Sequence, residues 1–160
     1  MRKVTAGLFH AIDGVVEAPN LFQFDSFDGD LGAMLTQILG RVDTVLMGRV
    51  GYEEWAGYWP DAQVDDDFAR FINGVPKFVA SETLSGPLAW NNAQLIEGDV
   101  LAFVKNLKQT EGGEISAMGG ISLVRQLLSN GMWDDADYRL FYNVNFPPVP
   151  APMVKGSKVA

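Results

Sequence analysis

The sequence predicts a three-layer α/β domain in which helices flank a central, mixed but mostly parallel sheet. Short apolar runs of strand character alternate with amphipathic segments of helical spacing, and this alternation is typical of α/β folds. Two of the apolar runs end in glycine just before a helical segment, at Gly48 and at Gly119-Gly120. A chain of 160 residues suits one ordinary domain. We therefore expect a single domain over residues 1–146 and a proline-rich tail over 147–160.

The first half of the chain contains the segments on either side of the first glycine turn. Residues 4–9 are an apolar run that ends at Asp13-Gly14, a dipeptide typical of turns, and residues 15–27 follow as a long loop. Apolar residues recur at helical spacing over 31–39, and Gly40 ends this helix. The other segments predicted here are a strand at 42–47, a helix that opens at 52–55, a helix at 65–72 and a strand at 76–80.

The second half of the chain repeats this alternation around the second glycine turn. The amphipathic segment 100–107 predicts a helix, and the apolar segment 114–118 predicts a strand. Residues 122–128 predict a helix that ends at Asn130-Gly131. A last strand is predicted over 138–146, and the prolines that follow cannot join a central strand.

Composition and charge exclude several classes of function. The formal net charge is −8 and the isoelectric point is about 4.5, so we expect the surface to repel nucleic acids and anionic membranes. The chain has no cysteine, which excludes disulfides and a cysteine nucleophile. No apolar run approaches the ~20 residues of a membrane span, and no signal peptide or metal-ligand spacing is evident. We therefore expect a cytoplasmic protein without a metal.

The two glycine turns are the clearest candidates for a binding site. The first N–H groups of a helix lack internal partners and carry a partial positive charge, so they bind anions. Glycine lets a phosphate approach the backbone, and Arg49 adds a charged, planar fork of donors beside the first turn. The alternative is that both glycines serve only the turns themselves. Neither G-x-G-x-x-G nor G-x-x-x-x-G-K-[ST] occurs in the chain.

Four segments together carry a resemblance to a known family. They are Asp13-Gly14 after the first strand; Val45-Leu46-Met47-Gly48-Arg49 followed by Tyr52, Glu53 and Trp55; Pro76-Lys77-Phe78-Val79-Ala80-Ser81 with Thr83-Leu84; and Met118-Gly119-Gly120 with Leu123, Leu127 and Leu128. In this order and spacing the chain resembles the dihydrofolate reductase-like superfamily, in the branch similar to the reductase (C-terminal) domain of the bifunctional riboflavin-biosynthesis protein. The resemblance implies that fold, a reduced nicotinamide cofactor, usually NADPH, laid across the strand ends, and often a homodimer.

The resemblance also implies which residues bind the cofactor. They are Gly48, Arg49 and Val50 beside the adenosine phosphates; Ser81, Thr83 and Leu84 at the adenosine ribose and ring; Gly119, Gly120 and Ile121 around the pyrophosphate, with Leu123 on the following helix; and Asp13 and Val16 in the loop over the nicotinamide. Arg49 is the expected partner of the 2′-phosphate. Ser81 and Thr83 also fit a simpler role as a helix-cap pair.

The chain departs from the family pattern in three places. Gly51 stands where family members commonly have threonine, which removes a hydroxyl that binds phosphate. Asp28 and Asp30 precede the helix rather than lying within it, so the acid that protonates dihydrofolate has no counterpart and the catalytic residues stay unassigned. Residues 131–135 resemble a turn of the family, but no strand hairpin is recognisable after them.

Three further groups have both a structural and a functional interpretation. His10, the sole histidine, is expected to be structural rather than a general acid or base. The run Asp65-Asp66-Asp67 is expected to be a solvated helix start rather than a cation site. Trp55, Tyr58 and Trp59 are expected to pack together or to form an interface, and the alternative is stacking on a flat substrate.

These observations predict an NADPH-dependent reductase that transfers hydride to a small unsaturated or heteroaromatic substrate, such as a pterin- or pyrimidine-like ring. The proton is expected from water or from the substrate. Two alternatives stay open. One is a non-catalytic relative that binds a nucleotide or a pterin-like ligand, and the other is an oligomeric protein that uses exposed aromatic residues for self-association.

Overall fold

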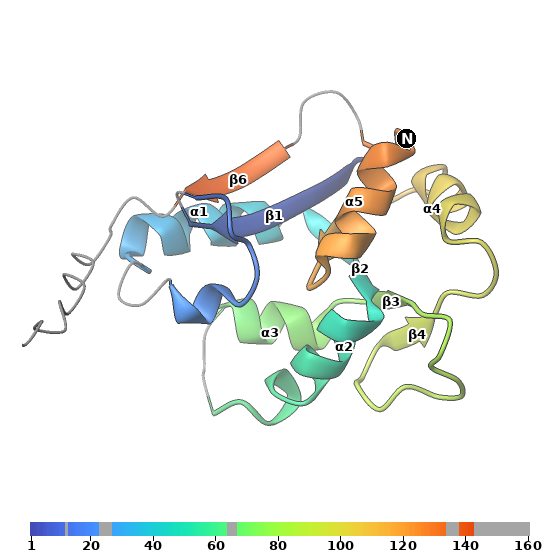
Figure 1. Ribbon diagram of the computed structural model, residues 1–160, viewed down its shortest axis with the longest axis horizontal. Helices are drawn as coiled ribbons and strands as arrows, with labels where there is room; N and C mark the ends of the chain where they lie inside the picture. The colour runs from blue at the N-terminus through green and yellow to red at the C-terminus, as the bar shows by residue number, and fades with distance from the viewer. Residues whose placement is uncertain (12, 23–26, 64–66, 134–137, 143–160) are drawn as a thin grey trace, which may run out of the picture.

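A six-stranded sheet with the order β4-β3-β2-β5-β1-β6 forms the centre of the fold (Figure 1). The computed structural model describes residues 1–11, 13–22, 27–63, 67–133 and 138–142. Every pair of neighbouring strands in this sheet is parallel, so the carboxyl ends of the strands lie along one edge. The strands are β1 (Val4–His10), β2 (Val42–Gly48), β3 (Lys77–Ala80), β4 (Ala93–Leu95), β5 (Glu114–Met118) and β6 (Tyr138–Tyr142).

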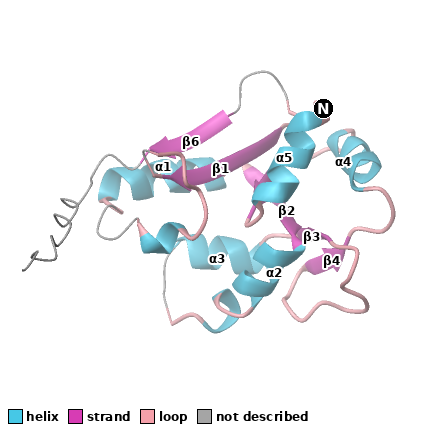
Figure 2. Ribbon diagram, viewed as in Figure 1, coloured by secondary structure: helices cyan, strands magenta, loops and turns pink. Residues whose placement is uncertain are grey.

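Helices cover both faces of this sheet (Figure 2). They are α1 (Gly29–Leu39), α2 (Arg49–Ala56), α3 (Asp67–Gly74), α4 (Val100–Lys108) and α5 (Ile121–Ser129), with short 3₁₀ turns at η1 (Pro19–Leu21) and η2 (Trp59–Asp61). The helices α1, α2 and α3 lie on one face, and α4 and α5 lie on the other (Figure 1). None of the helices in the described part of the chain is long and apolar enough to span a membrane.

The two faces of the sheet bury separate clusters of apolar side chains. Successive residues of β2 point to opposite faces, so Leu46 packs against α5, whereas Val45 and Met47 pack on the side of α2 and α3. The buried cluster beside α4 and α5 comprises Val4, Leu46, Ile96, Val104, Ile115, Ala117, Leu123, Val124, Leu127 and Met132. The cluster beside α2 and α3 comprises Val42, Val45, Met47, Tyr52, Ile72, Val75, Val79 and Trp90. Burial on both faces is typical of parallel sheets, and the predicted three-layer α/β fold is confirmed.

A buried arginine joins three strands at the amino edge of the sheet. Arg2 donates from Nε to the carbonyl of Gly113 (2.9 Å) and from Nη2 to Oγ1 of Thr44 (2.7 Å) and to the carboxylate of Asp43. The N–H of Gly113 donates to the same carboxylate. Because these residues lie at the beginnings of β1, β2 and β5, the network holds the amino ends of these three strands together. The candidate site lies in the loops at the opposite, carboxyl edge of the sheet.

A second buried cation lies at the start of β3. The side chain of Lys77 is fully buried, and its Nζ donates to the carbonyls of Ile72 (2.7 Å) and Val75 (2.8 Å). The ring centroid of Trp90 is 4.5 Å from the same nitrogen. Burial lowers the pKa of the Lys77 amine to about 8 from its ordinary value of 10.5, while the carbonyls and the aromatic face favour its charged form.

We expect the stability of this protein, compared with that of a Lys77→Met variant, to rise by about 2 kcal/mol between about pH 8 and pH 10. The folded-state pKa lies below the unfolded-state value, so in this window the unfolded chain binds more protons and rising pH favours the folded state. Below about pH 8 the amine is charged in both states, and the whole desolvation cost is present. Urea denaturation of both proteins across this range measures the difference, and a difference independent of pH would contradict the prediction.

The predicted elements differ from the observed ones in a few places. The short strand β4 was not anticipated, and η1 lies within the segment predicted as a loop. The helix α1 begins at Gly29, so the prediction that Asp30 precedes this helix is wrong, and Asp30 lies in its first turn. The helix α2 begins at Arg49 rather than at Tyr52, because Gly48 caps it directly after β2. The last strand begins at Tyr138 as predicted, but residues 143–160, with the proline-rich tail, lie outside the described residues. Among the strands that the structure describes there is no antiparallel pair, so the antiparallel component of the predicted mixed sheet is not seen there.

Candidate functional site

The two glycine turns lie side by side at the carboxyl edge of the sheet. The neighbouring strands β2 and β5 pair in parallel, with Met47 opposite Met118, so the turns that follow them leave the sheet at the same edge. The helix α2 then packs on one face, and α5 packs on the other. In open α/β sheets, the position where successive helices leave toward opposite faces is where ligands bind. We call the segments Gly48–Gly51 and Gly119–Gly120 the glycine junction.

The glycine junction is held together by direct contact between its two backbones. A Cβ atom added to Gly51 would lie 1.4 Å from the carbonyl oxygen of Gly119, and one added to Gly120 would lie 3.1 Å from the nitrogen of Gly48. Gly119 itself has a φ of +64°, in the left-handed region that favours glycine. The absence of a side chain at Gly51 therefore has a steric reason, because a threonine there would overlap with the facing turn.

The helices that begin at the glycine junction have no side-chain cap. Gly48 caps α2 and Gly120 caps α5, and neither helix start receives a hydrogen bond from a capping side chain. In contrast, Asp28 caps α1 by accepting from the N–H of Leu31 (2.9 Å), and Asp99 caps α4 by accepting from an N–H of its first turn (2.7 Å). No capping side chain therefore competes with an external anion for the first N–H groups of α2 and α5.

Arg49 is the charged residue of the glycine junction. It is the first residue of α2, and its Nη1 lies 2.6 Å from Oε2 of Glu53, one turn along the same helix. Both side chains are about half exposed, at 42% for Arg49 and 46% for Glu53. The guanidinium is thus present where the sequence predicted it, but it is engaged by a carboxylate of its own helix.

The predicted adenosine contacts follow β3, the next strand beyond β2. The Oγ of Ser81 accepts hydrogen bonds from the N–H groups of Thr83 (3.1 Å) and Leu84 (2.9 Å). These hydrogen bonds order the turn after β3, but no described helix begins there, so the predicted helix-cap role is not seen. The contact of Ser81 with a cofactor stays a prediction. Leu84 packs against the apolar cluster beside α2 and α3, whereas Thr83 is exposed.

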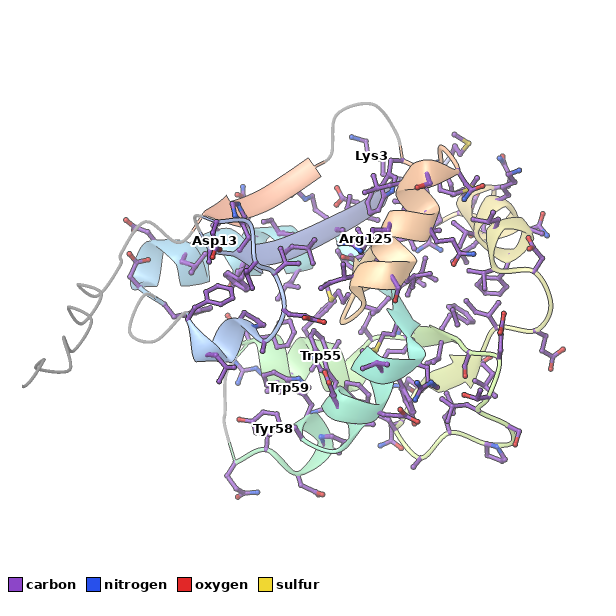
Figure 3. The ribbon with its side chains drawn as sticks, viewed as in Figure 1. Lys3, Asp13, Trp55, Tyr58, Trp59 and Arg125 are labelled. Carbon is purple, nitrogen blue, oxygen red and sulfur yellow. The ribbon has the colours of Figure 1, made fainter. Side chains whose placement is uncertain are left out.

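The predicted nicotinamide loop follows β1, on the other side of β5. The N–H of Val15 donates to Oδ1 of Asp13 (3.2 Å), and Gly14 takes a φ of +85°, so the expected turn is formed. Asp13 is exposed near the end of β1 (Figure 3), and Val16 is half-buried. The predicted cofactor-binding residues therefore follow four strands that are neighbours in the sheet, in the spatial order β3, β2, β5 and β1.

The aromatic residues after the first glycine turn pack against one another. Trp55 and Trp59 contact Phe68 edge to face, with ring centroids 5.7 Å and 4.9 Å away, and Tyr58 contacts Trp59 at 5.0 Å (Figure 3). Tyr58 stays 55% exposed. A Cβ added to Gly119 would lie 3.5 Å from the ring of Trp55. The aromatic cluster therefore also packs against the second glycine turn.

The remaining polar candidates have structural partners. Nδ1 of His10 lies 2.9 Å from the carbonyl of the next residue, and the side chain of Asp28 is engaged in the α1 cap. Asp67 pairs with Arg70, and this hydrogen bond holds the pKa of the Asp67 carboxyl below its ordinary value. Asp65 and the residue after it lie outside the described residues. The described side chains include no group of three His, Asp or Glu that could hold a metal ion.

Comparison with known families identifies the family to which the chain belongs. The sequence profile of the RibD C-terminal domain matches residues 2–142, which include both turns and all six strands. The chain belongs to the RibD C-terminal domain family. It is therefore a member of a reductase-type family, and the resemblance seen in the sequence is confirmed.

Two further matches extend over most of the chain. The uncharacterised protein YyaP of Bacillus subtilis strain 168 is 28% identical over 138 residues, which are 84% of this chain and 71% of YyaP. The crystal structure of a candidate riboflavin biosynthesis protein from Shewanella sp. PV-4 matches with a TM-score of 0.57 at 18% identity, covering 82% of this chain and 72% of that chain. At this identity the likeness shows the fold alone.

A short, strong similarity links the chain to a different protein. It is 66% identical over 41 residues to the 5′-nucleotidase SurE of Cereibacter sphaeroides strain ATCC 17025. These residues make up 26% of this chain, and the match spans only 16% of the length of SurE. A fragment of that size does not carry the activity of the whole SurE protein to this chain.

Two features of the glycine junction were missed by sequence reasoning. The sequence showed Gly51 only as a missing hydroxyl, because its contact with Gly119 joins two turns that are distant along the chain. The ion pair between Arg49 and Glu53 could have been predicted from the sequence, because residues at positions i and i+4 of a helix are neighbours.

Proposed function

We propose that the chain is an NADPH-dependent reductase whose cofactor binds over the glycine junction. The observation that carries the proposal is the pair of uncapped helix starts, of α2 and α5, that meet there in backbone contact. Membership of the RibD C-terminal domain family supports the reductase class. We further propose a cytoplasmic homodimer with the reductase domain at residues 1–146.

The residues of the glycine junction fit a phosphate-bearing cofactor. Gly119 and Gly120 present no side chain that would hold a pyrophosphate away from the N–H groups at the start of α5. Arg49 supplies a guanidinium at the start of α2, where it can receive the 2′-phosphate that distinguishes NADPH from NADH. Ser81 orders the turn after β3, beside which the adenosine would lie.

The chemical step divides between the cofactor and the protein. When bound, NADPH supplies the hydride to a small unsaturated or heteroaromatic substrate. The chain would supply orientation: the glycine junction would hold the phosphates, the turn after β3 would hold the adenosine, and the loop with Asp13 and Val16 would cover the reacting end and exclude water. Asp28 is engaged as the cap of α1, and Asp30 is exposed in the first turn of that helix. No acid of the chain is assigned to the substrate, and the proton is proposed to come from water or from the substrate itself.

Thermal unfolding in the presence of NADPH tests this proposal. At about ten times its dissociation constant, NADPH is expected to stabilise the fold by about 1.4 kcal/mol, seen as a rise in Tm, and NADH at the same concentration is expected to do less. Emission of the tryptophans, among them Trp55 beside Gly119, is expected to fall on binding, because reduced nicotinamide accepts their excitation. If neither dinucleotide raises Tm, the cofactor proposal fails.

Turnover is tested separately from binding. NADPH absorbance would be followed with pterins, pyrimidines and flavin precursors as candidate substrates, at a protein concentration that binds the cofactor. Oxidation of NADPH that depends on one of these rings supports the reductase. Tight binding of NADPH with no oxidation across this panel would instead favour a non-catalytic nucleotide-binding member of the family.

A further inference from the structure

On the first two turns of α2, Arg49 forms an ion pair with Glu53. Arg49 is the proposed partner of the 2′-phosphate, and the Glu53 carboxylate is an anion that competes with this phosphate. Nη1 of Arg49 contacts Oε2 of Glu53 at 2.6 Å, and about half of each side chain is exposed to solvent. This is the spacing at which opposite charges on a helix attract each other. A phosphate that binds Arg49 must therefore either share the guanidinium with the carboxylate or displace it.

The negative net charge of the chain increases the effect of this competition on phosphate binding. The chain carries a formal net charge of −8, so the attraction of an anion to the glycine junction depends on local groups rather than on the overall field. Glu53 places a negative charge in direct contact with the cation at the start of α2. A dianionic phosphate at Arg49 meets repulsion from that carboxylate, whereas a free ribose hydroxyl at the same position does not.

We propose that Glu53 is a specificity-determining residue that lowers the affinity for the 2′-phosphate of NADPH by competing for Arg49. The inference rests on the proposed function, because it assumes that the dinucleotide binds at the glycine junction. When the phosphate binds, the Arg49–Glu53 pair opens, and when the phosphate leaves, the pair forms again. Glu53 therefore raises the dissociation rate of NADPH and lowers the ratio of the affinity for NADPH to that for NADH.

A Glu53→Gln variant tests this inference, since glutamine keeps the size of the side chain and removes its charge. Titrations of the intact chain with NADPH and NADH, followed by tryptophan emission at low ionic strength, give both dissociation constants. Because exposed ion pairs are weak, we expect NADPH to bind roughly two- to fivefold more tightly to the variant, with a slower dissociation rate. Binding of NADH is expected to stay unchanged.

The neighbouring residue Glu54 supplies a matched control. Glu54→Gln makes the same change in net charge at an exposed position on the same helix, and it is expected to leave both affinities unchanged. Equal tightening by the two variants would overturn the inference in favour of a general charge effect. Weaker NADPH binding by Glu53→Gln would also overturn it, because Glu53 would then be orienting Arg49 rather than competing for it.

A double variant separates failure of this inference from failure of the proposed function. In an Arg49→Ala background, Glu53→Gln is expected to have no further effect on NADPH affinity, because the two residues act as one unit. If the unmodified chain binds NADPH through Arg49 but Glu53→Gln changes nothing, only the role of Glu53 is wrong. If the unmodified chain binds neither dinucleotide, the proposed function fails and the inference fails with it.

Discussion

A Gly51→Ala variant is expected to lose about 4 kcal/mol or more of its free energy of unfolding, an exceptional loss for one methyl group. The added Cβ would lie 1.4 Å from the carbonyl oxygen of Gly119 and 2.3 Å from its carbonyl carbon. Both are backbone atoms, so relief requires the turn after β5 to move away from the start of α2. Urea denaturation followed by circular dichroism measures the loss, and insolubility of the variant on expression would agree with it.

Substitutions at two other glycines are expected to cause smaller losses of stability and serve as controls. A Cβ added to Gly120 would lie 3.1 Å from the nitrogen of Gly48, so Gly120→Ala is expected to cost about 1 to 2 kcal/mol. A Cβ added to Gly57 meets its nearest atom at the ordinary contact distance of 3.5 Å, and Gly57→Ala is expected to change stability by less than about 0.5 kcal/mol. Equal stability of the Gly51 and Gly57 variants would contradict the contact between the two turns.

An Arg49→Ala variant is expected to bind NADPH roughly 20- to 100-fold more weakly while its affinity for NADH falls by less than about threefold. The guanidinium is expected to contact only the 2′-phosphate, which NADH lacks. Its removal breaks an exposed ion pair with Glu53, which contributes little to stability. Isothermal titration calorimetry with both dinucleotides measures the two affinities.

Arg70 provides the matched control for this substitution. Like Arg49, it is an exposed arginine that pairs with a carboxylate of its own helix, in this case Asp67 of α3. Arg70→Ala is therefore expected to leave both affinities unchanged. Equal weakening of NADPH and NADH by Arg49→Ala would rule out the 2′-phosphate role and indicate a contact with a part that both dinucleotides share.

Local signals in the sequence were enough to predict most of the fold. The alternation of strand-like and helical segments, with turn residues such as Gly14 and Gly40 between them, specified the class and most elements. The same signals placed Gly48 and Gly119 between a strand and a helix, which is where the structure has them. These predictions succeeded because they depend on chain stereochemistry within a few residues.

Contacts between distant segments were beyond the reach of such signals. The strand β4 has only three residues and owes its conformation to pairing with β3. The start of α2 at Arg49 could not be predicted from a capping side chain, because the cap residue is Gly48. The burial of Lys77 likewise depends on carbonyls at the end of α3 that accept from its amine, and the charge alone favoured an exposed position.

The glycine caps of α2 and α5 also affect how this site can change during evolution. Its proposed phosphate contacts are mostly backbone N–H groups, which are encoded by no particular side chain. Substitution at outward positions such as Val50, which is 55% exposed, therefore removes no phosphate donor. A new side chain at Gly51, in contrast, obstructs the facing turn. Divergence can therefore change the exposed side chains around this site, and with them the ligands that it accepts, whereas Gly51, Gly119 and Gly120 at its centre have little room for added atoms.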